Sequence, residues 1–500
     1  MLARKRMIWG IALVIVLAAA AAGGWLWWKK NGTHGTAKQE ALTPVKSVSA
    51  VKDSYDVIVT GTDPEGIAAA VSAARNGLKV LLVDGRNRDI LGGLMTLGWL
   101  NTLDLNYAPD KPVIPGKHNF LDKGIFQEFY DRIEGTSFDT VTAANVFYDM
   151  VRKEPNIDLL MKAKEMKPLT ESTAEGSRVT GLELVKEDGT RQTVKAKAVI
   201  DATQDADIAA AAGAPFTMGR EDIGDPKSQM AVTLVFKLSG VTPEVWQSFR
   251  KQSDSFDEMS AAGFRAMKDY VSTNPERVRM RGLNIGRQND GTILINAMQI
   301  FGVNPFDPES VKDGIAIGQK EAPHVVEYMK KHYSEFKDVE LAGTAPELYV
   351  RETRHLIGEY RLSMTDLLDN RDFPDAIAYG SYPVDIQSTN AKDSGAVMMK
   401  PIEYGVPFRT LVPKKVDGPL VVGRAASFDS SPHGSARVIP LGMATGQAAG
   451  AAAKMAIDKG ITFRQPIAVE GRHRRPAGQA GAAEDGAQNV QVRSAGIYEA

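Results

Sequence analysis

The sequence predicts an α/β protein with a parallel sheet, into which a second α+β domain is inserted, preceded by one transmembrane helix. Three observations predict this architecture. Residues 55–84 form a pattern of strand, tight turn, helix and strand, which is how a nucleotide-binding βαβ unit begins. Residues 215–348 combine strand-like runs with polar helical stretches. The apolar run 7–28 is about long enough to cross a bilayer core of about 30 Å.

The composition excludes several classes of function. The 500 residues, 43% of them hydrophobic, suffice for one large core or two medium ones. The formal net charge of -1 argues against a nucleic-acid partner. The chain has no cysteine, which excludes disulfides, thiolate metal sites and cysteine nucleophiles. Its 7 histidines lack H-x-x-x-H and H-x-H spacing, so we expect no metal site.

The N-terminal segment 1–30 is the predicted membrane anchor. Basic residues 4–6 precede the apolar run, and tryptophans at its far end fit the aromatic belt of a membrane interface. A cleaved signal peptide is the rival, because alanines before Gly23 offer cleavage sites. The apolar run continues past these alanines, which favours an uncleaved anchor. We expect a single-pass protein of the cell membrane, with the N-terminus inside and the catalytic domain extracytoplasmic.

The rest of the chain divides by composition. Residues 31–52 are polar and aperiodic, which is typical of a flexible linker. The tail, 466–500, has few apolar residues, and we expect it to be disordered. Between them we predict a first part of the nucleotide-binding domain at 53–214, the inserted domain at 215–348 and a second part at 349–465.

A glycine turn at residues 61–66 follows the first strand. Unpaired N–H groups of the helix that starts here would face a pyrophosphate, and Asp84, at the end of the second strand, could accept from ribose hydroxyls. Asp63 stands where the G-x-G-x-x-G pattern has its second glycine. A carboxylate there repels phosphate unless its side chain turns away or caps the helix. The rival interpretation is a glycine-rich crossover without a ligand.

The remaining elements are predicted from periodicity and turn residues. The glycine pair Gly92-Gly93 lets the backbone approach a ligand closely, or is an ordinary loop. We predict helices at 125–133, 143–152, 208–214, 243–270, 308–333 and 440–455. We predict strands at 157–160, 197–201, 230–238, 292–298 and 419–422, a hairpin of 178–187 with 191–196, and a polar loop at 427–437.

Residues 349–360 bring two arginines and a histidine together. These residues could present cations to an anionic substrate. They could equally form salt bridges with Glu352 and Glu359 on a solvated face, which is what composition alone favours.

With these segments in place, the chain resembles the FAD-dependent oxidoreductases with a glutathione-reductase-like FAD domain, allied to fumarate reductase and succinate dehydrogenase flavoproteins. The resemblance covers residues 54–461. It rests on GTDPEGIAAAVSAARNGLKVLLVD, LGGLMTLG, VIDATQDADIAAAAGAP, RETRHLIGEY and VVGRAASFDSSPHGSARVIPLGMATGQAAGAAA, in that order. The last block is the most specific, being similar to the segment that closes over the flavin. Asp63 and Gln204 depart from the family's glycines.

The resemblance implies a Rossmann-like FAD-binding domain that holds FAD without a covalent bond. The expected FAD-binding residues are Gly61, Asp63, Pro64, Glu65, Gly66, Asp84, Gly92, Gly93, Asp201, Ala202, Thr203, Asp205, Gly423, Arg424, Gly442 and Met443. The implied reaction is hydride transfer between a small organic substrate and flavin N5. Candidates for binding its charge and moving its proton are Arg354, His355, His433 and Arg437.

Two further interpretations stay open. One is a FAD-binding protein without turnover that serves as a membrane-tethered assembly factor. The other is a dehydrogenase of the same fold that passes electrons to a membrane quinone. Because FAD is made in the cytoplasm, a catalytic domain that faces the cytoplasm also stays open.

Overall fold

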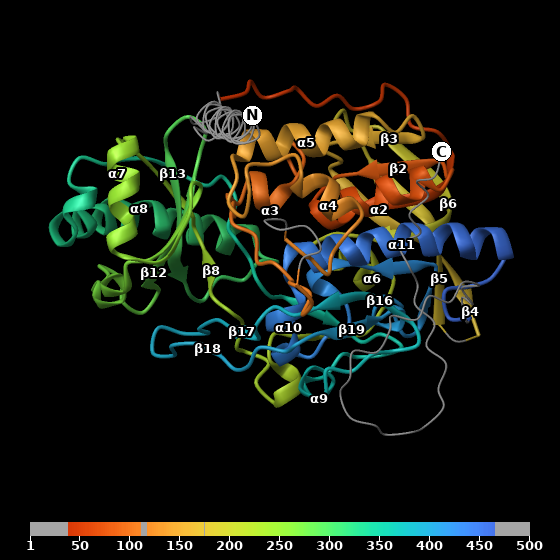
Figure 1. Ribbon diagram of the computed structural model, residues 1–500. Coiled ribbons are helices and arrows are strands. Elements are labelled where there is room, and N and C mark those ends of the chain that lie inside the picture. The colour runs from red at the N-terminus through yellow and green to blue at the C-terminus, as the bar shows by residue number, and fades with distance from the viewer. Residues whose placement is uncertain (1–38, 112–117, 175, 466–500) are drawn as a thin grey trace, which may run out of the picture.

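The computed structural model describes residues 39–111, 118–174 and 176–465 (Figure 1). These residues form two large sheets, one of eight strands and one of seven. The predicted anchor and the predicted tail lie outside the described residues. Within the described part of the chain, no helix is both long and apolar enough to cross a membrane.

The eight-stranded sheet is parallel at its centre. Strand β1 (Ser54–Thr60) lies between β2 (Val80–Val83) and β6 (Arg191–Asp201) and runs parallel to both. Its β-branched residues and all of β2 are buried, as expected for strands covered on both faces. The predicted α/β fold with a parallel sheet is therefore confirmed.

Further strands extend this sheet on both sides. Strand β3 (Ile157–Leu160) is parallel to β2, and β21 (Pro419–Val421) is parallel to β6. Strand β5 (Gly176–Val185) is antiparallel to β6 and to β4 (Glu165–Thr173), and β20 (Val416–Asp417) closes the edge. The predicted hairpin is confirmed, and its second strand continues without a break through the predicted strand at 197–201. Strand β4 was not predicted.

Two helices pack against each other over the central strands. Helix α2 (Pro64–Arg75) lies along α11 (Ile439–Lys459), as Figure 1 shows. A Cβ atom on Gly446 would overlap the Glu65 carbonyl oxygen, so the two backbones meet at this point. Helix α5 (Thr140–Arg152) packs on the same helix α2.

The seven-stranded sheet belongs to the inserted domain and is antiparallel throughout. Its strands are β8 (Val232–Thr233), β9 (Phe236–Ser239), β10 (Ser253–Phe256), β11 (Ser260–Gly263), β12 (Val278–Arg287), β13 (Ile293–Ile300) and β14 (Glu340–Thr344). With the long helix α8 (Pro308–His332), they enclose a hydrophobic core of their own. The chain passes into this domain at Thr233 and leaves it at Tyr349, where each backbone N–H donates to the other's carbonyl, at 2.9 and 2.8 Å.

The smaller elements complete the chain. The short helices are α3 (Gly93–Thr96), α4 (Ile125–Tyr130), α6 (Asp207–Ala211), α7 (Pro243–Ser248), α9 (Met364–Leu368) and α10 (Ser430–Ala436). The short strands are β7 (Phe216–Met218), β15 (Arg354–Leu356), β16 (Ala376–Gly380), β17 (Asp385–Ile386), β18 (Ala396–Val397) and β19 (Tyr404–Pro407).

Three predictions about local structure were wrong. The helix expected over 243–270 ends with α7, and the chain then forms the β10–β11 hairpin, because Asp257 accepts from two backbone N–H groups of the turn. The loop expected at 427–437 contains α10. The described part of the expected linker, 39–52, lies on the domain, where the Val48 N–H donates to Leu159 and Val51 is buried.

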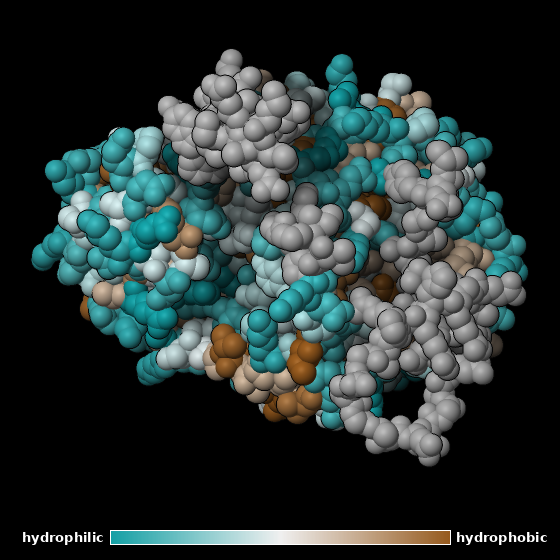
Figure 2. All heavy atoms as spheres, viewed as in Figure 1, coloured by the Kyte–Doolittle hydropathy of each residue, from teal (hydrophilic) through white to brown (hydrophobic). Residues whose placement is uncertain are grey.

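The surface seen in Figure 2 is mostly hydrophilic. Brown side chains gather at its lower edge, where Figure 1 shows α9 and β18. Exposed apolar side chains in and beside these elements are Leu368, Val397, Met398 and Ile402.

We predict that Gly446→Ala lowers the free energy of unfolding by about 1–3 kcal/mol, because the added methyl group forces α11 away from α2. Urea unfolding measures this loss. Ala451→Ser, on the half-buried side of the same helix, should change it by less than about 0.5 kcal/mol. Equal stability of Gly446→Ala and the wild type would contradict the close packing.

Candidate functional site

A narrow cavity of about 20 Å³ lies where the parallel strands end, the usual place for a ligand in such a sheet. The glycine turn and α3 form one side, and the segment leaving the inserted domain and the start of α11 form the other. The lining residues are Glu65, Leu94, Leu100, Thr102, Asp104, Gln204, Tyr349, Val350, Arg351, Arg424, Arg437 and Ile439.

The glycine turn is held tightly against the sheet. Gly61 has φ 97°, and its N–H donates to the Val83 carbonyl at 2.8 Å. A Cβ on Gly66 would overlap the Gly61 carbonyl oxygen, so a side chain at 66 would open the turn. Pro64 occupies the first turn of α2, where a missing N–H costs nothing. The turn therefore brings backbone to the edge of the cavity.

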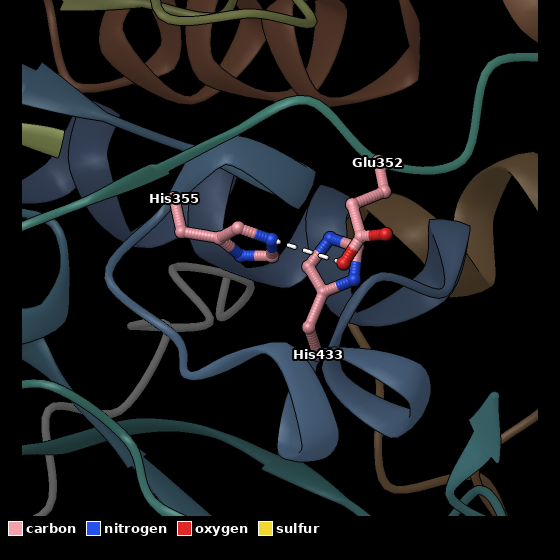
Figure 3. Close-up of side chains that lie close together, drawn as sticks. All are labelled: Glu352, His355 and His433. Carbon is pink, nitrogen blue, oxygen red and sulfur yellow. Dashed lines mark hydrogen bonds and ion pairs between the residues drawn. The ribbon is translucent and has the colours of Figure 1, made fainter. Parts of the chain in front are cut away.

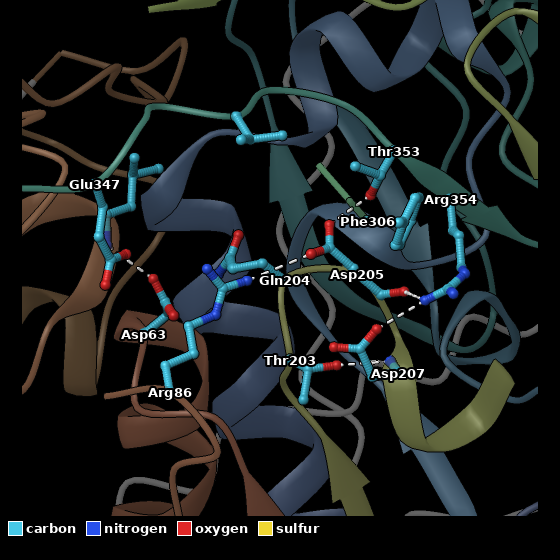
Figure 4. A network of polar contacts seen from close by, with 12 residues as sticks. Asp63, Arg86, Thr203, Gln204, Asp205, Asp207, Phe306, Glu347, Thr353 and Arg354 are labelled. Atoms are coloured by element: carbon cyan, nitrogen blue, oxygen red, sulfur yellow. Dashed lines mark hydrogen bonds and ion pairs between the residues drawn. The ribbon is translucent and has the colours of Figure 1, made fainter. Parts of the chain in front are cut away.

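The side chain of Asp63 turns away from the helix N-terminus, one of the two arrangements that the sequence left open. It accepts from Arg88 at 2.7 Å and from the Leu94 N–H at 2.8 Å. Burial by itself would raise the pKa of Asp63, but the guanidinium groups of Arg88 and Arg86 outweigh it and lower the pKa. Arg88 is buried and also binds Glu347, at 2.8 Å (Figure 4 shows Asp63, Arg86 and Glu347).

Glu65 fills the space beside the start of α2. Its Oε1 would lie 2.9 Å from a Cβ on Gly423 and 3.0 Å from one on Gly442, so it occupies the gap between these glycines. Gln204, which replaces a family glycine, donates to the other carboxyl oxygen at 3.2 Å. Burial, reinforced by the charge of Asp63, raises the pKa of Glu65 to about 7.

Asp84 closes the second strand as predicted and is already hydrogen-bonded by the turn. It accepts from the Thr62 N–H at 3.2 Å and from the Arg86 N–H at 2.6 Å. Arg88 lies 3.4 Å from it. These bonds fix the carboxylate at the carboxyl end of β2.

The segment after β6 is fixed by its own carboxylates. Asp201 accepts from the backbone N–H groups of Thr203 at 3.1 Å and Ala209 at 2.8 Å, and burial raises its pKa to about 6. Asp205 accepts from Arg424 at 2.6 Å, which ties the end of β6 to the end of β21 (Figure 4 shows Asp205). Ala202 is buried beneath Gly61.

The remaining predicted FAD contacts also lie around this cavity. Gly92 and Gly93 have positive φ, 97° and 37°, and a Cβ on Gly93 would overlap the Asp63 carboxylate. Gly442 and Met443 are buried in the first turn of α11. Residues from the first and second parts of the FAD-binding domain therefore meet beside this cavity.

The four predicted catalytic candidates do not share one place. Arg437 lines the cavity, donates to the Tyr349 hydroxyl at 2.9 Å and lies 3.3 Å from Asp385. Arg354 points elsewhere, to Asp207 at 2.8 Å, with its guanidinium over the Phe306 ring (Figure 4). His355 and His433 are buried against each other, and neither lines the cavity (Figure 3).

Arg351 is one of three buried arginines that line the cavity, with Arg424 and Arg437. The sequence placed it in the cationic segment 349–360 but not among the catalytic candidates. Arg351 donates to the Ala231 carbonyl at 2.8 Å and to Thr233 Oγ1 at 2.9 Å, and stacks on the Tyr349 ring. Among the described residues it forms no ion pair. Of the pairs with Glu352 and Glu359 that the sequence left open, the structure has His355 with Glu352, at 3.1 Å, and this pair is buried instead of lying on a solvated face; Glu359 pairs with Arg464. Burial, with the charges of Arg437 and Arg281, lowers the pKa of Arg351 to about 10.

Asp104 was also missed, since no motif surrounds it. It stands half-buried in the cavity wall and shares a hydrogen bond with Tyr382. Burial raises the pKa of Asp104, and Arg437 opposes the rise. Two carboxyl groups, a phenol and three arginines thus meet in one cavity.

We predict that Arg88→Met lowers the free energy of unfolding by about 3–5 kcal/mol, because the carboxylates of Asp63 and Asp84 lose their buried counter-ion. Urea unfolding measures the change. The control Arg265→Met removes a side chain that is 79% exposed and should change stability by less than about 1 kcal/mol. Equal effects of the two substitutions would contradict the role of Arg88.

Known proteins were compared with the whole chain. Among curated proteins, none matches. Similar solved structures include a geranylgeranyl bacteriochlorophyll reductase-like protein from Thermoplasma acidophilum, 14% identical over 82% of this chain and 80% of its own, with a TM-score of 0.39. The myxobacterial chondrochloren halogenase CndH is 12% identical over 83% and 77%, with a TM-score of 0.40. These structures are too distant to indicate the substrate or reaction of this chain.

The family comparison is specific. The family model described as FAD dependent oxidoreductase matches residues 56–472, which include the glycine turn, the inserted domain and α11. The family expected from the sequence is confirmed. The chain belongs to the FAD-dependent oxidoreductase family and is an enzyme whose cofactor is FAD.

Proposed function

We propose that the protein transfers a hydride between FAD and a small organic anion bound in the cavity beside Arg351. The observation that carries this proposal is that Arg351 is a buried guanidinium without a carboxylate partner among the described residues. A buried charge is costly unless it is paired. A carboxylate or sulfate on the substrate would supply the missing partner.

The residues around the cavity fit FAD. The turn at 61–66 and the start of α11 have glycines where a Cβ would overlap backbone or the Glu65 carboxyl group, and Asp63 is turned aside. The glycine turn would hold the pyrophosphate, Asp84 the ribose, and Gly442 and Met443 the flavin end. When bound, FAD supplies the acceptor or donor of the hydride.

Two arginines would bind the substrate anion. Arg351 and Arg437 both line the cavity and both contact Tyr349, Arg351 by stacking and Arg437 through the hydroxyl. A guanidinium binds a carboxylate through two parallel hydrogen bonds, which orients as well as attracts it. The pair would thus fix the position of the substrate carbon that gains or loses the hydride.

Asp104 would move the proton that accompanies the hydride. Burial raises the pKa of Asp104, which favours the protonated form of its carboxyl group, and its bond to Tyr382 orients it. His355 and His433, which the sequence offered for this step, are separated from the cavity by its lining residues.

We predict that FAD affinity depends on the protonation of Glu65. The ionised carboxylate repels a pyrophosphate, so the affinity should be constant below pH 7 and fall by about tenfold per pH unit well above it. Glu65→Gln should bind FAD equally at both ends of this range. Quenching of flavin fluorescence on titration of the apoprotein measures this.

The control for this titration is Glu309→Gln, because Glu309 is exposed at the start of α8 and should leave the wild-type pH profile unchanged. A wild-type affinity that does not change with pH would contradict the role of Glu65. An unchanged pH profile in Glu65→Gln would contradict it as well.

We predict that Arg351→Met raises KM by about 10- to 100-fold, because one charged hydrogen-bonded pair with the substrate is lost. The FAD content, read from absorbance, should stay that of the wild type. Arg265→Met serves as the exposed control and should leave KM unchanged. A wild-type KM in Arg351→Met would place the anion elsewhere.

We predict that Asp104→Asn lowers kcat by about 100- to 10,000-fold with little change in KM, because the amide can neither give nor take the proton. Steady-state kinetics with a dye acceptor measure both constants. A loss confined to KM would show that Asp104 binds the substrate instead.

A dye-coupled screen of organic acids against their neutral amides and esters tests the function itself. We expect turnover of acids and weak or no turnover of the matched neutral compounds. Equal rates for an acid and its amide would overturn the proposal of an anionic substrate.

We also propose that residues 1–30 anchor the enzyme in the cell membrane as a single span, with the catalytic domain outside. The basic start, the apolar run and the tryptophans support this. Such an anchor would bring the enzyme close to a membrane quinone as electron acceptor. Retention of the full chain in carbonate-washed membranes, and quinone-dependent reoxidation, test the two parts separately.

A further inference from the structure

A buried cluster of Glu352, His355 and His433 lies behind the cavity, and the proposed reaction uses none of its side chains. One oxygen of Glu352 and one ring nitrogen of each histidine lie within 4.8 Å of one another. Figure 3 shows the three side chains approaching from three directions, with the His355 ring turned toward the Glu352 carboxylate. All three residues are at most 1% exposed.

Two segments far apart in the sequence build the cluster. His355 lies in β15, which pairs with β7, and Glu352 lies two residues before this strand. His433 lies in the middle of α10, and its ring meets that of His355 edge to face, 4.6 Å between centroids. This separation explains why the histidine spacing predicted no metal site.

Hydrogen bonds inside the protein leave the cluster incompletely satisfied. Glu352 accepts from the Met230 N–H at 2.8 Å and lies 3.1 Å from His355 Nε2. No lysine or arginine of the described residues forms an ion pair with Glu352. The Nδ1 atoms of both histidines are buried without a hydrogen-bond partner. A buried carboxylate requires a positive charge beside it.

We propose that Glu352, His355 and His433 bind a divalent transition-metal ion of the zinc type. Two imidazoles and one carboxylate are a donor set that Zn²⁺ takes in proteins. The 3.1 Å between Glu352 Oε1 and His355 Nε2 matches two ligands of one ion, since bonds of about 2.1 Å put neighbouring donors about 3.0–3.4 Å apart.

The surroundings provide what such an ion needs. The Met230 N–H orients the carboxylate, and the Arg424 carbonyl oxygen lies 3.1 Å from His433 Nε2, where it can orient the ring or supply a further donor. A ring nitrogen that binds the ion carries no proton. In the rival arrangement, without metal, His355 Nε2 forms a hydrogen bond with Glu352 instead.

The ion would have a structural role. It would join the segment that carries Arg351 to α10, whose last turn leads into Arg437. Arg351 and Arg437 are the two arginines that we propose bind the substrate, so the ion would fix the distance between them without taking part in the reaction.

The test is the metal content of the full chain, expressed in zinc-supplemented medium and purified without chelator. Mass spectrometry of the dissolved metal should find about one equivalent of zinc per chain. His433→Gln and Glu352→Gln should each lose at least about nine tenths of it, because only two ligands remain. His324→Gln, which removes an exposed histidine of α8, should retain it.

Circular dichroism and bound FAD establish that each variant is folded. A folded wild-type chain with less than about one tenth of an equivalent of any transition metal would overturn the site and favour the hydrogen bond between His355 and Glu352. Wild-type zinc content in folded His433→Gln would overturn it too. Neither result depends on turnover, so the proposed function stands or falls separately.

Discussion

The close approach of three backbones is the constraint on which the rest of the structure depends. The glycine turn meets the end of β6 at Gly61, and α11 at Gly446, with no side chain between the backbones. Protein interiors are packed too densely for such a junction to absorb an added methyl group. Because Glu65, Gln204 and Ile439 extend from these three segments into the lining of the cavity, the spacing of the segments sets one side of it.

This junction carries an unusual number of charges for a buried place. Arg88 forms ion pairs with Asp63 and Asp84, and Arg424 forms one with Asp205. The two arginines also join loops from different parts of the chain. Glu65 and Asp201 have no arginine or lysine ion-pair partner among the described residues. Gln204 donates a hydrogen bond to Glu65, and backbone N–H groups donate to Asp201. Asp63 and Gln204, the two departures from the family's glycines, therefore both act on Glu65, Asp63 through its charge and Gln204 through a hydrogen bond.

The sequence predicted what depends on local pattern. The β-branched strand, the glycine turn and helix α8, with Pro308 at its start and basic residues at its end, were all recognised from neighbouring residues. Strand β12 was missed because arginines alternate with its apolar residues, and the β10–β11 hairpin because its pairing is set by a turn. Arg351 was assigned to a solvated face because composition does not show which segment the inserted domain covers. The approach of His355 to His433 arises only when β15 and α10 pack together.

The junction at Thr233 and Tyr349 has a consequence for how such enzymes can diverge. The two strands that lead into and out of the inserted domain are hydrogen-bonded to each other, so the chain enters and leaves the domain at a single place. Its core is separate from those of the parallel sheet. An exchange of this whole unit for another would therefore keep the backbone path of the FAD-binding half. Because Arg351 lies two residues beyond the junction, each such exchange would place different side chains opposite the same guanidinium group.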